Sequence, residues 1–152
     1  MTEDRLIHLI AGVIVFFIFI KLSKLNINKK AMIYGFVAMS LGTWVSDWDL
    51  FLGIGFHRSP ITHSALPALL FGWLILKYKL PKMLIIGFSI GLASHMLWDI
   101  IAYGNVQWIS GGNNDRLFLF VNFIILIAAS LFIKNKFLTS SSSGTTKTQV
   151  AP

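Results

Sequence analysis

The chain has 152 residues, of which 55% are hydrophobic and only 12% are charged. Soluble domains carry about 25% charged residues, so this composition excludes an ordinary soluble domain and indicates a one-domain integral membrane protein. The absence of cysteine excludes disulfides and thiolate metal sites. The net charge of +7 does not indicate a nucleic-acid partner, because the lysines stand in short clusters between apolar segments.

Five apolar segments follow one another, each near the roughly 20 residues that a helix needs to cross the hydrocarbon core. They run over residues 6–22, 31–45, 61–78, 83–102 and 117–133. This pattern predicts an all-α membrane bundle of about five helices, with residues 1–136 as the embedded domain. The Ser/Thr-rich residues 137–152 have no periodicity, and we expect them to form a disordered tail.

The basic residues predict how the bundle is oriented. Ten of the thirteen follow the first, third and fifth segments, and only Arg5, Arg58 and Arg116 lie on the opposite side. Cytoplasmic loops of membrane proteins are enriched in Lys and Arg. We therefore expect a multi-pass protein of the plasma (inner) membrane, with its N-terminus outside and its C-terminus in the cytoplasm.

Most of the imidazoles and carboxylates fall near the outer ends of these segments. Segment length and charge bias together predict that these residues lie at one membrane face and at similar depth. Ionisable residues at membrane depth are expensive and usually functional. The candidate metal ligands are His8, Asp47, Asp49, His57, His63, His95 and Asp99.

Two short motifs carry most of these groups. In "SHMLWD", His95 and Asp99 are four apart on one helical face, where they can bind one metal ion or the carboxylate can orient the imidazole. In "SDWDLF", Asp47 and Asp49 are two apart, so an extended or turn segment would let both face one hard cation. A plain solvated loop is the alternative for the second motif.

The stretch "HRSPITHS" supplies the other polar groups. Pro60 favours a turn and is expected to open the third helix, so that His57 and His63 flank that turn. Arg58 suits a phosphate or carboxylate group, which it can grip through two parallel hydrogen bonds. Thr62 and Ser64 are candidates to cap the helix.

The set is large enough for one metal ion or two. A divalent cation lowers the pKa of its water and polarises a phosphoryl or carbonyl oxygen. Without thiolates, the donors suit zinc, manganese or magnesium. The chain has no cysteine to act as a nucleophile, so we expect a metal-activated water at the outer face. Arg58 would orient the anionic group, and Asp49 or Asp99 would serve as general base.

Over residues 5–112 the order of these motifs resembles the family of predicted membrane-bound metal-dependent hydrolases, the inner-membrane YdjM-like group. The matching positions are His8, Asp47, Asp49, His57, Arg58, Thr62, His63, Ser64, Ser94, His95 and Asp99. The resemblance implies a metal-dependent hydrolase, with Thr62, Ser64 and Ser94 supporting the ligands. The chain departs from the pattern at Ser46 and Leu50, and by one extra residue after Arg58. The site's location suggests a lipid or another amphiphile as substrate, with the cleaved bond an ester or phosphoester.

Two other functions stay open. A metal-free lipid phosphatase with a phosphohistidine would use His95, oriented by Asp99, although "RSPITHS" matches the motifs of such enzymes poorly. A small transporter would need polar residues across the membrane, and the inner halves of the segments hold mainly Asn122. A metal-stabilised scaffold is the remaining non-enzymatic function.

Overall fold

The computed structural model describes residues 2–53, 57–106 and 113–138, and every regular element among them is helical. The elements are α1 (Thr2–Leu22), α2 (Lys29–Val45), the 3-10 helix η1 (Ser46–Leu52), α3 (Leu66–Lys77), α4 (Met83–Ala102), α5 (Asn113–Ile133) and the π-helical turn η3 (Lys134–Leu138). The expected all-α class is therefore confirmed. The expected disordered tail, residues 137–152, lies outside the described residues except for residues 137 and 138.

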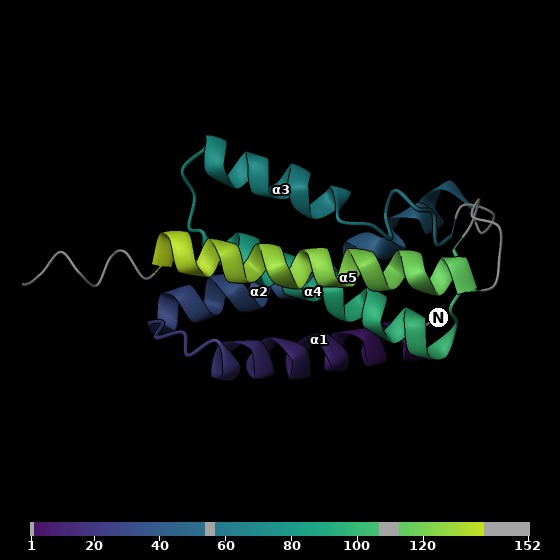
Figure 1. The fold of residues 1–152 in the computed structure, drawn as a ribbon, viewed down its shortest axis with the longest axis horizontal. Helices are drawn as coiled ribbons and strands as arrows, with labels where there is room; N and C mark the ends of the chain where they lie inside the picture. Colours follow the sequence, from purple (N-terminus) through teal and green to yellow (C-terminus); the bar gives the residue numbers. More distant parts are fainter. Residues whose placement is uncertain (1, 54–56, 107–112, 139–152) are drawn as a thin grey trace, which may run out of the picture.

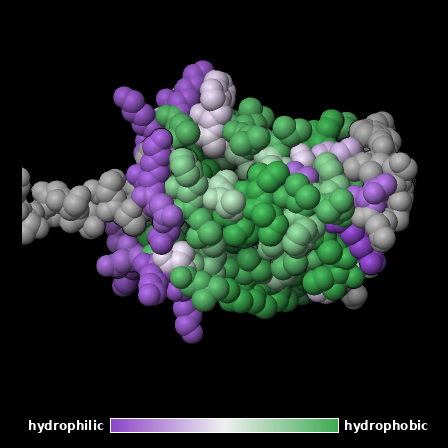
Figure 2. All heavy atoms as spheres, in the orientation of Figure 1, coloured by the Kyte–Doolittle hydropathy of each residue, from purple (hydrophilic) through white to green (hydrophobic). Residues whose placement is uncertain are grey.

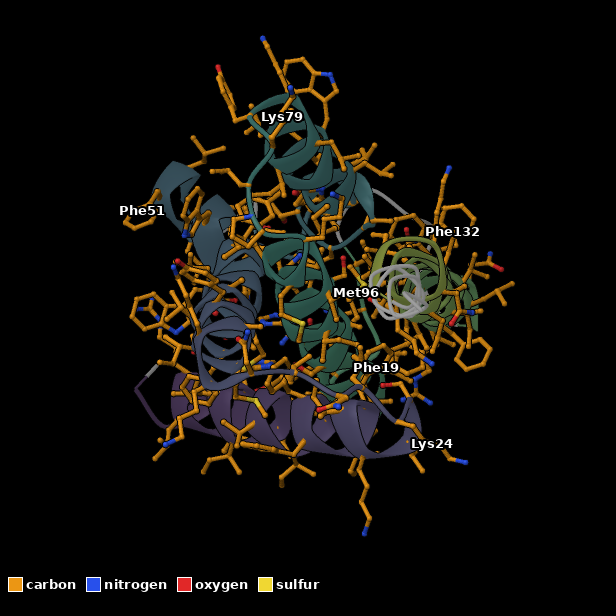
Figure 3. All side chains as sticks on the ribbon, turned by 90° about the vertical axis from the view of Figure 1, so that its left-hand side faces the viewer. Phe19, Lys24, Phe51, Lys79, Met96 and Phe132 are labelled. Atoms are coloured by element: carbon orange, nitrogen blue, oxygen red, sulfur yellow. The ribbon has the colours of Figure 1, made fainter. Side chains whose placement is uncertain are left out.

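The helix α4 forms the core of the bundle. Seen end-on, it lies in the middle, with Met96 at its centre and α1, α2, α3 and α5 around it (Figure 3). Within the described residues, α1, α4 and α5 are long and apolar enough to cross a membrane. A helix of about 20 residues spans roughly 30 Å, which matches the hydrocarbon core.

The helix α2 packs on α4 through glycines. A Cβ atom on Gly91 would overlap the carbonyl oxygen of Met39, and one on Gly42 would overlap that of Phe88. Only glycine permits backbones to approach so closely, as at small-residue interfaces between membrane helices. This contact fixes the height of α2 against α4, and therefore the position of the elements that follow α2.

The third apolar segment does not begin its helix where we expected. Residues 57–65 form turns, and α3 begins at Leu66 with Pro67 in its first turn, so Pro60 does not open the helix. The backbone N–H of Ala65 donates instead to Oδ1 of Asn122 on α5, at 2.9 Å. At 12 residues, α3 is about 18 Å long and shorter than a full membrane crossing.

The surface divides into an apolar middle and a strongly hydrophilic end. Hydrophobic residues cover the middle of the molecule, and hydrophilic residues crowd the end farthest from the N-terminus (Figures 1 and 2). At that end lie the C-terminal turns of α1 and α3, which carry Lys21 and Lys77, and the first residue of α2, Lys29. The His/Asp residues lie at the other end.

Candidate metal centre

The site forms where the start of α1, the end of α4, η1 and the turns before α3 meet (Figure 1). Each element contributes one or two polar side chains that point inward. The convergent groups are His8 from α1, Asp47 from η1, His63 from the turns, and His95 and Asp99 from α4. Segments far apart in the sequence therefore supply one cluster, as the sequence predicted.

Asp99 is the centre of the cluster. Its Oδ2 atom lies 3.2 Å from Nε2 of His63 and 3.3 Å from Nε2 of His95. Its Oδ1 atom lies 4.0 Å from Nε2 of His8. Asp47 completes the group, with Oδ1 3.7 Å from Nε2 of His95. His8, His63, His95 and Asp99 are all buried, whereas the Asp47 side chain is 15% exposed.

A main-chain carbonyl fixes the orientation of His95. Its Nδ1 atom lies 2.9 Å from the carbonyl oxygen of Thr43 on α2. A carbonyl oxygen can only accept, so the ring proton resides on Nδ1. The Nε2 atom therefore points at Asp99. This is the arrangement that metal-binding histidines adopt.

Thr62 and Asp49 orient His63 in the same sense. The Thr62 hydroxyl donates to Oδ2 of Asp49 at 2.6 Å, and its oxygen lies 3.1 Å from Nδ1 of His63. Because the hydroxyl proton is used on Asp49, the oxygen accepts from Nδ1–H. The Nε2 atom of His63 then faces Asp99.

Two imidazole nitrogens thus converge on one carboxylate oxygen, because Nε2 of His63 and Nε2 of His95 both lie beside Oδ2 of Asp99. Nε2 of His63 and Oδ2 of Asp99 are buried without a hydrogen bond of good geometry. Zinc ligands in a tetrahedral site lie about 3.3 Å apart when the bonds are 2.0–2.1 Å long. The separations of 3.2 and 3.3 Å match that spacing. The spacing of each imidazole from Asp99 therefore fits a divalent cation.

His8 extends this donor set from the side of α1. One donor atom from each of His8, His95 and Asp99 lies within 4.8 Å of the others, a spacing that can hold a metal ion. The His8 ring stacks on that of His95, with centroids 3.8 Å apart and planes 6° from parallel.

Asp49 plays a different part from the one its motif predicted. The 3-10 turn directs Asp47 to the cluster and Asp49 behind it, so the pair does not face one site. Asp49 accepts from the backbone N–H of Ser59 at 2.9 Å and lies 3.4 Å from Nδ1 of His57. Burial raises the pKa of Asp49, but the hydrogen bonds from His57, Thr62 and Ser59 outweigh it and hold the pKa below its usual value. Asp49 positions His63.

Three other expected residues lie outside the convergent group. His57 is 28% exposed, and its Nδ1 atom lies beside Asp49 rather than Asp99. Ser64 bonds the carbonyl of Ile61 at 3.0 Å, and Ser94 bonds that of Gly91 at 2.7 Å. Both hydroxyls serve local backbone, so neither supports a ligand.

A small cavity of about 70 Å³ opens onto the cluster. It places basic groups, two carboxylates and two imidazoles around one space. Its walls are Arg5, His8, Asp47, Leu50, His57, Arg58, Asp99 and Tyr103. Asp47, Asp99 and His8 are therefore reachable from this cavity, whereas His63 and His95 lie behind them.

Several residues of the site carried no signal in the sequence. Thr43 acts through its carbonyl, which any residue would supply. Arg5 looked like one basic residue near the N-terminus, and only the fold brings it to the cavity. The Arg58 guanidinium stacks on the Tyr103 ring and donates a hydrogen bond to the Asn105 side chain. A polar or aromatic residue after a membrane helix is too common to predict such contacts.

The described residues define an all-helical protein with three helices able to cross a membrane and a buried His/Asp cluster able to hold a metal ion. The chain belongs to the family described as Domain of unknown function (DUF5942), which matches residues 41–138. That span includes Asp47, His63, His95 and Asp99 but begins after His8. No curated protein and no solved structure matches the chain.

Proposed function

We propose that the protein is a membrane-bound metal-dependent hydrolase that cleaves an ester or phosphoester of a lipid or another amphiphile. The observation that carries the proposal is the convergence of Nε2 of His63 and Nε2 of His95 on Oδ2 of Asp99, beside a cavity that Asp99 lines and that a substrate group can enter. Imidazole nitrogen and carboxylate oxygen at this spacing are donors that a divalent cation can bridge. The resemblance to predicted membrane-bound metal-dependent hydrolases supports the same function.

The membrane setting follows from the surface. The apolar middle fits the hydrocarbon core, and the lysine-rich end fits the cytoplasmic face by the positive-inside rule (Figure 2). We infer that α2 and α3 are also embedded, α3 as a half-length helix. The site then opens at the periplasmic or extracellular surface of the plasma membrane, at headgroup depth.

His8, His63, His95 and Asp99 would hold the ion, which we propose to be zinc because imidazole nitrogen with carboxylate oxygen suits it. Such a cation supplies a water of lowered pKa and polarises the bond to be cleaved. Asp47 lines the cavity and is partly exposed, so it is the group placed to take the proton from water. Arg58 binds the substrate's anionic group.

Asp49 is not placed to act as the base. Its carboxylate is occupied by donors from Ser59, Thr62 and His57, and it does not line the cavity. Its lowered pKa also makes it a weak proton acceptor. The general-base role expected for Asp49 or Asp99 therefore passes to Asp47 in this proposal.

A metal-stabilised scaffold is the second candidate function. The observation in its favour is that the donors come from four separate segments, so one ion would cross-link most of the bundle. A scaffold does not need arginines beside an open cavity. A phosphohistidine at His95 is disfavoured, because that ring lies behind the residues that line the cavity.

The test is metal analysis of the detergent-purified protein, together with activity on a panel of carboxyl esters, phosphomonoesters and phosphodiesters. We expect about one zinc per chain and chelator-sensitive hydrolysis. The Asp99→Asn variant should lose both the bound zinc and the hydrolysis. Asp115→Asn is the matched control, because Asp115 is a buried carboxylate on α5 that accepts from the N–H of Val106. A protein that binds no divalent metal would overturn the proposal, and metal binding without activity on the panel would favour the scaffold.

A further inference from the structure

Arg58 is held in an unusual conformation. Its backbone φ is 61°, a left-handed conformation that is costly for any residue other than glycine. The guanidinium stacks on the Tyr103 ring, with Cζ 3.7 Å from the centroid, and Nη1 donates to the side chain of Asn105. Nε of Arg58 is buried and has no hydrogen-bond partner.

Arg5 contributes a second positive charge to the same cavity. It lies in the second turn of α1, one turn before His8, and lines the cavity with Arg58. Within the described residues, neither Arg5 nor Arg58 forms an ion pair with a carboxylate. The charges of both arginines therefore remain available to an incoming anion.

The cavity limits the size of that anion. At about 70 Å³ it is far smaller than the roughly 300–1,000 Å³ of sites that enclose a whole drug-sized ligand. It can take a terminal group the size of a phosphate, while the rest of the molecule stays outside. A phosphodiester would need room for a second substituent, and a carboxyl ester carries no charge for two arginines to bind.

The rim of the cavity is suited to a lipid. Leu6, next to Arg5, is 58% exposed, and Leu50 lies on the wall. Apolar residues at the border between a charged cavity and an apolar surface let an alkyl chain remain in the membrane while its head enters the site. A water-soluble phosphate ester has no use for such a rim.

We propose that the substrate is a membrane lipid with a terminal phosphate monoester, bound as a dianion between Arg5 and Arg58. This inference rests on the proposed metal-dependent hydrolysis, since Asp47 and Asp99 would repel the dianion without a cation. The oxygen of water forms a bond to phosphorus, and the bond from phosphorus to the lipid oxygen breaks. The lipid leaves as an alcohol and inorganic phosphate is released, with one water consumed.

The first test measures binding of inorganic phosphate to the zinc-loaded protein in detergent by isothermal titration calorimetry. Arg58→Gln and Arg5→Gln should each raise the Kd about 10-fold or more, since each removes charge-assisted hydrogen bonds. Arg58→Lys should recover only part of the loss, because lysine lacks the planar fork. Lys21→Gln, at the far end of α1, is the control and should leave the Kd unchanged. Because Arg5 is exposed, its variant probes binding without disturbing the core.

The second test compares substrates in mixed micelles: dioleoyl phosphatidic acid, dioleoyl phosphatidylcholine and water-soluble glycerol 3-phosphate. We expect hydrolysis of phosphatidic acid alone, with phosphate release reduced at least 10-fold by either arginine variant. Zinc-loaded protein that binds no phosphate would overturn the phosphate site while leaving the metal centre intact. Equal turnover of glycerol 3-phosphate would overturn the lipid assignment. Failure to bind zinc would instead defeat the proposed function itself.

Discussion

The imidazole of His95 donates through Nδ1 to the main-chain carbonyl of Thr43, across 2.9 Å. This bond joins α4 to α2 one helical turn beyond the glycine contact between them. The height of α2 on α4 therefore decides whether Nε2 of His95 points at Asp99. Packing deep in the bundle and the chemistry of the site are coupled through this one bond.

The first prediction concerns this packing. Gly91→Ala should destabilise the protein by about 1–3 kcal/mol, because the added methyl group overlaps the backbone of Met39 and separates the helices. It should also weaken zinc binding by displacing Thr43. Gly72→Ala is the control, since a Cβ there meets only Ile85 at an ordinary 3.5 Å. Thermal unfolding in detergent and zinc titration measure the two effects. Equal behaviour of both variants would contradict the coupling.

A second prediction isolates the residue that orients His63. Thr62→Val removes the hydroxyl that bonds both Asp49 and Nδ1 of His63. Loss of such a supporting group costs about 10- to 100-fold in metal affinity. Ser64→Ala should leave the affinity unchanged, because the Ser64 hydroxyl bonds the carbonyl of Ile61. Competition with a zinc-sensitive dye measures both values. An affinity unchanged in Thr62→Val would remove His63 from the ligand set.

Metal removal gives a third prediction. The donors bridge separate segments, so a bound ion stabilises the folded bundle by about 2.7 kcal/mol when its free concentration is 100 times the Kd. A chelator should therefore lower the Tm of the wild-type protein. The Tm of Asp99→Asn should not respond, because that variant has no ion to lose. A chelator effect of equal size in both proteins would indicate an ion bound elsewhere.

A fourth prediction concerns the start of α3. Asn122→Leu removes the acceptor for the N–H of Ala65, and an unpaired buried N–H costs about 1–3 kcal/mol. We expect lower thermal stability and faster proteolysis near residues 57–65. Ser130→Ala is the control on the same helix, because its hydroxyl bonds only Leu126 of α5. Identical stability of the two variants would show that this interhelical bond contributes little.

The orientation in the membrane yields a fifth prediction. The chain has no cysteine, so a single introduced thiol reports its own location. Phe51→Cys lies at the end with the metal site, is 86% exposed in the wild type, and should react with an impermeant maleimide in intact cells. Lys79→Cys directly follows α3, which ends at the lysine-rich end, and should react only after the membrane is permeabilised (Figure 1). The reverse pattern would place the site in the cytoplasm.

The long helices could be predicted from the sequence because continuous hydrophobicity determines them directly. The segment 83–102 coincides with α4 (Met83–Ala102). The third segment was harder, because Thr62 lies inside it and, together with Ser59, binds Asp49, so that the chain forms turns there. Local pattern cannot reveal that competition, because Asp49 lies ten residues before Ser59.

The candidate site, like the fold, could be predicted only in part. The spacing of His95 and Asp99 on a helix predicted a shared face, and the structure confirms that both reach the cluster. The pair Asp47 and Asp49 was expected to act together, but a 3-10 turn rotates successive side chains by about 120°, so residues two apart diverge. Groups that act through backbone atoms, such as Thr43, leave no trace in the residue types.

The spread of the donors along the chain also sets an order for synthesis. His8 leaves the ribosome first, whereas His95 and Asp99, on which the other donors converge, enter the membrane only with α4. A nascent chain that stops before α4 carries isolated imidazoles and no chelating centre. A metal ion could then bind only to chains in which α4 has been synthesised. The bound ion would distinguish finished from unfinished copies for quality-control proteases.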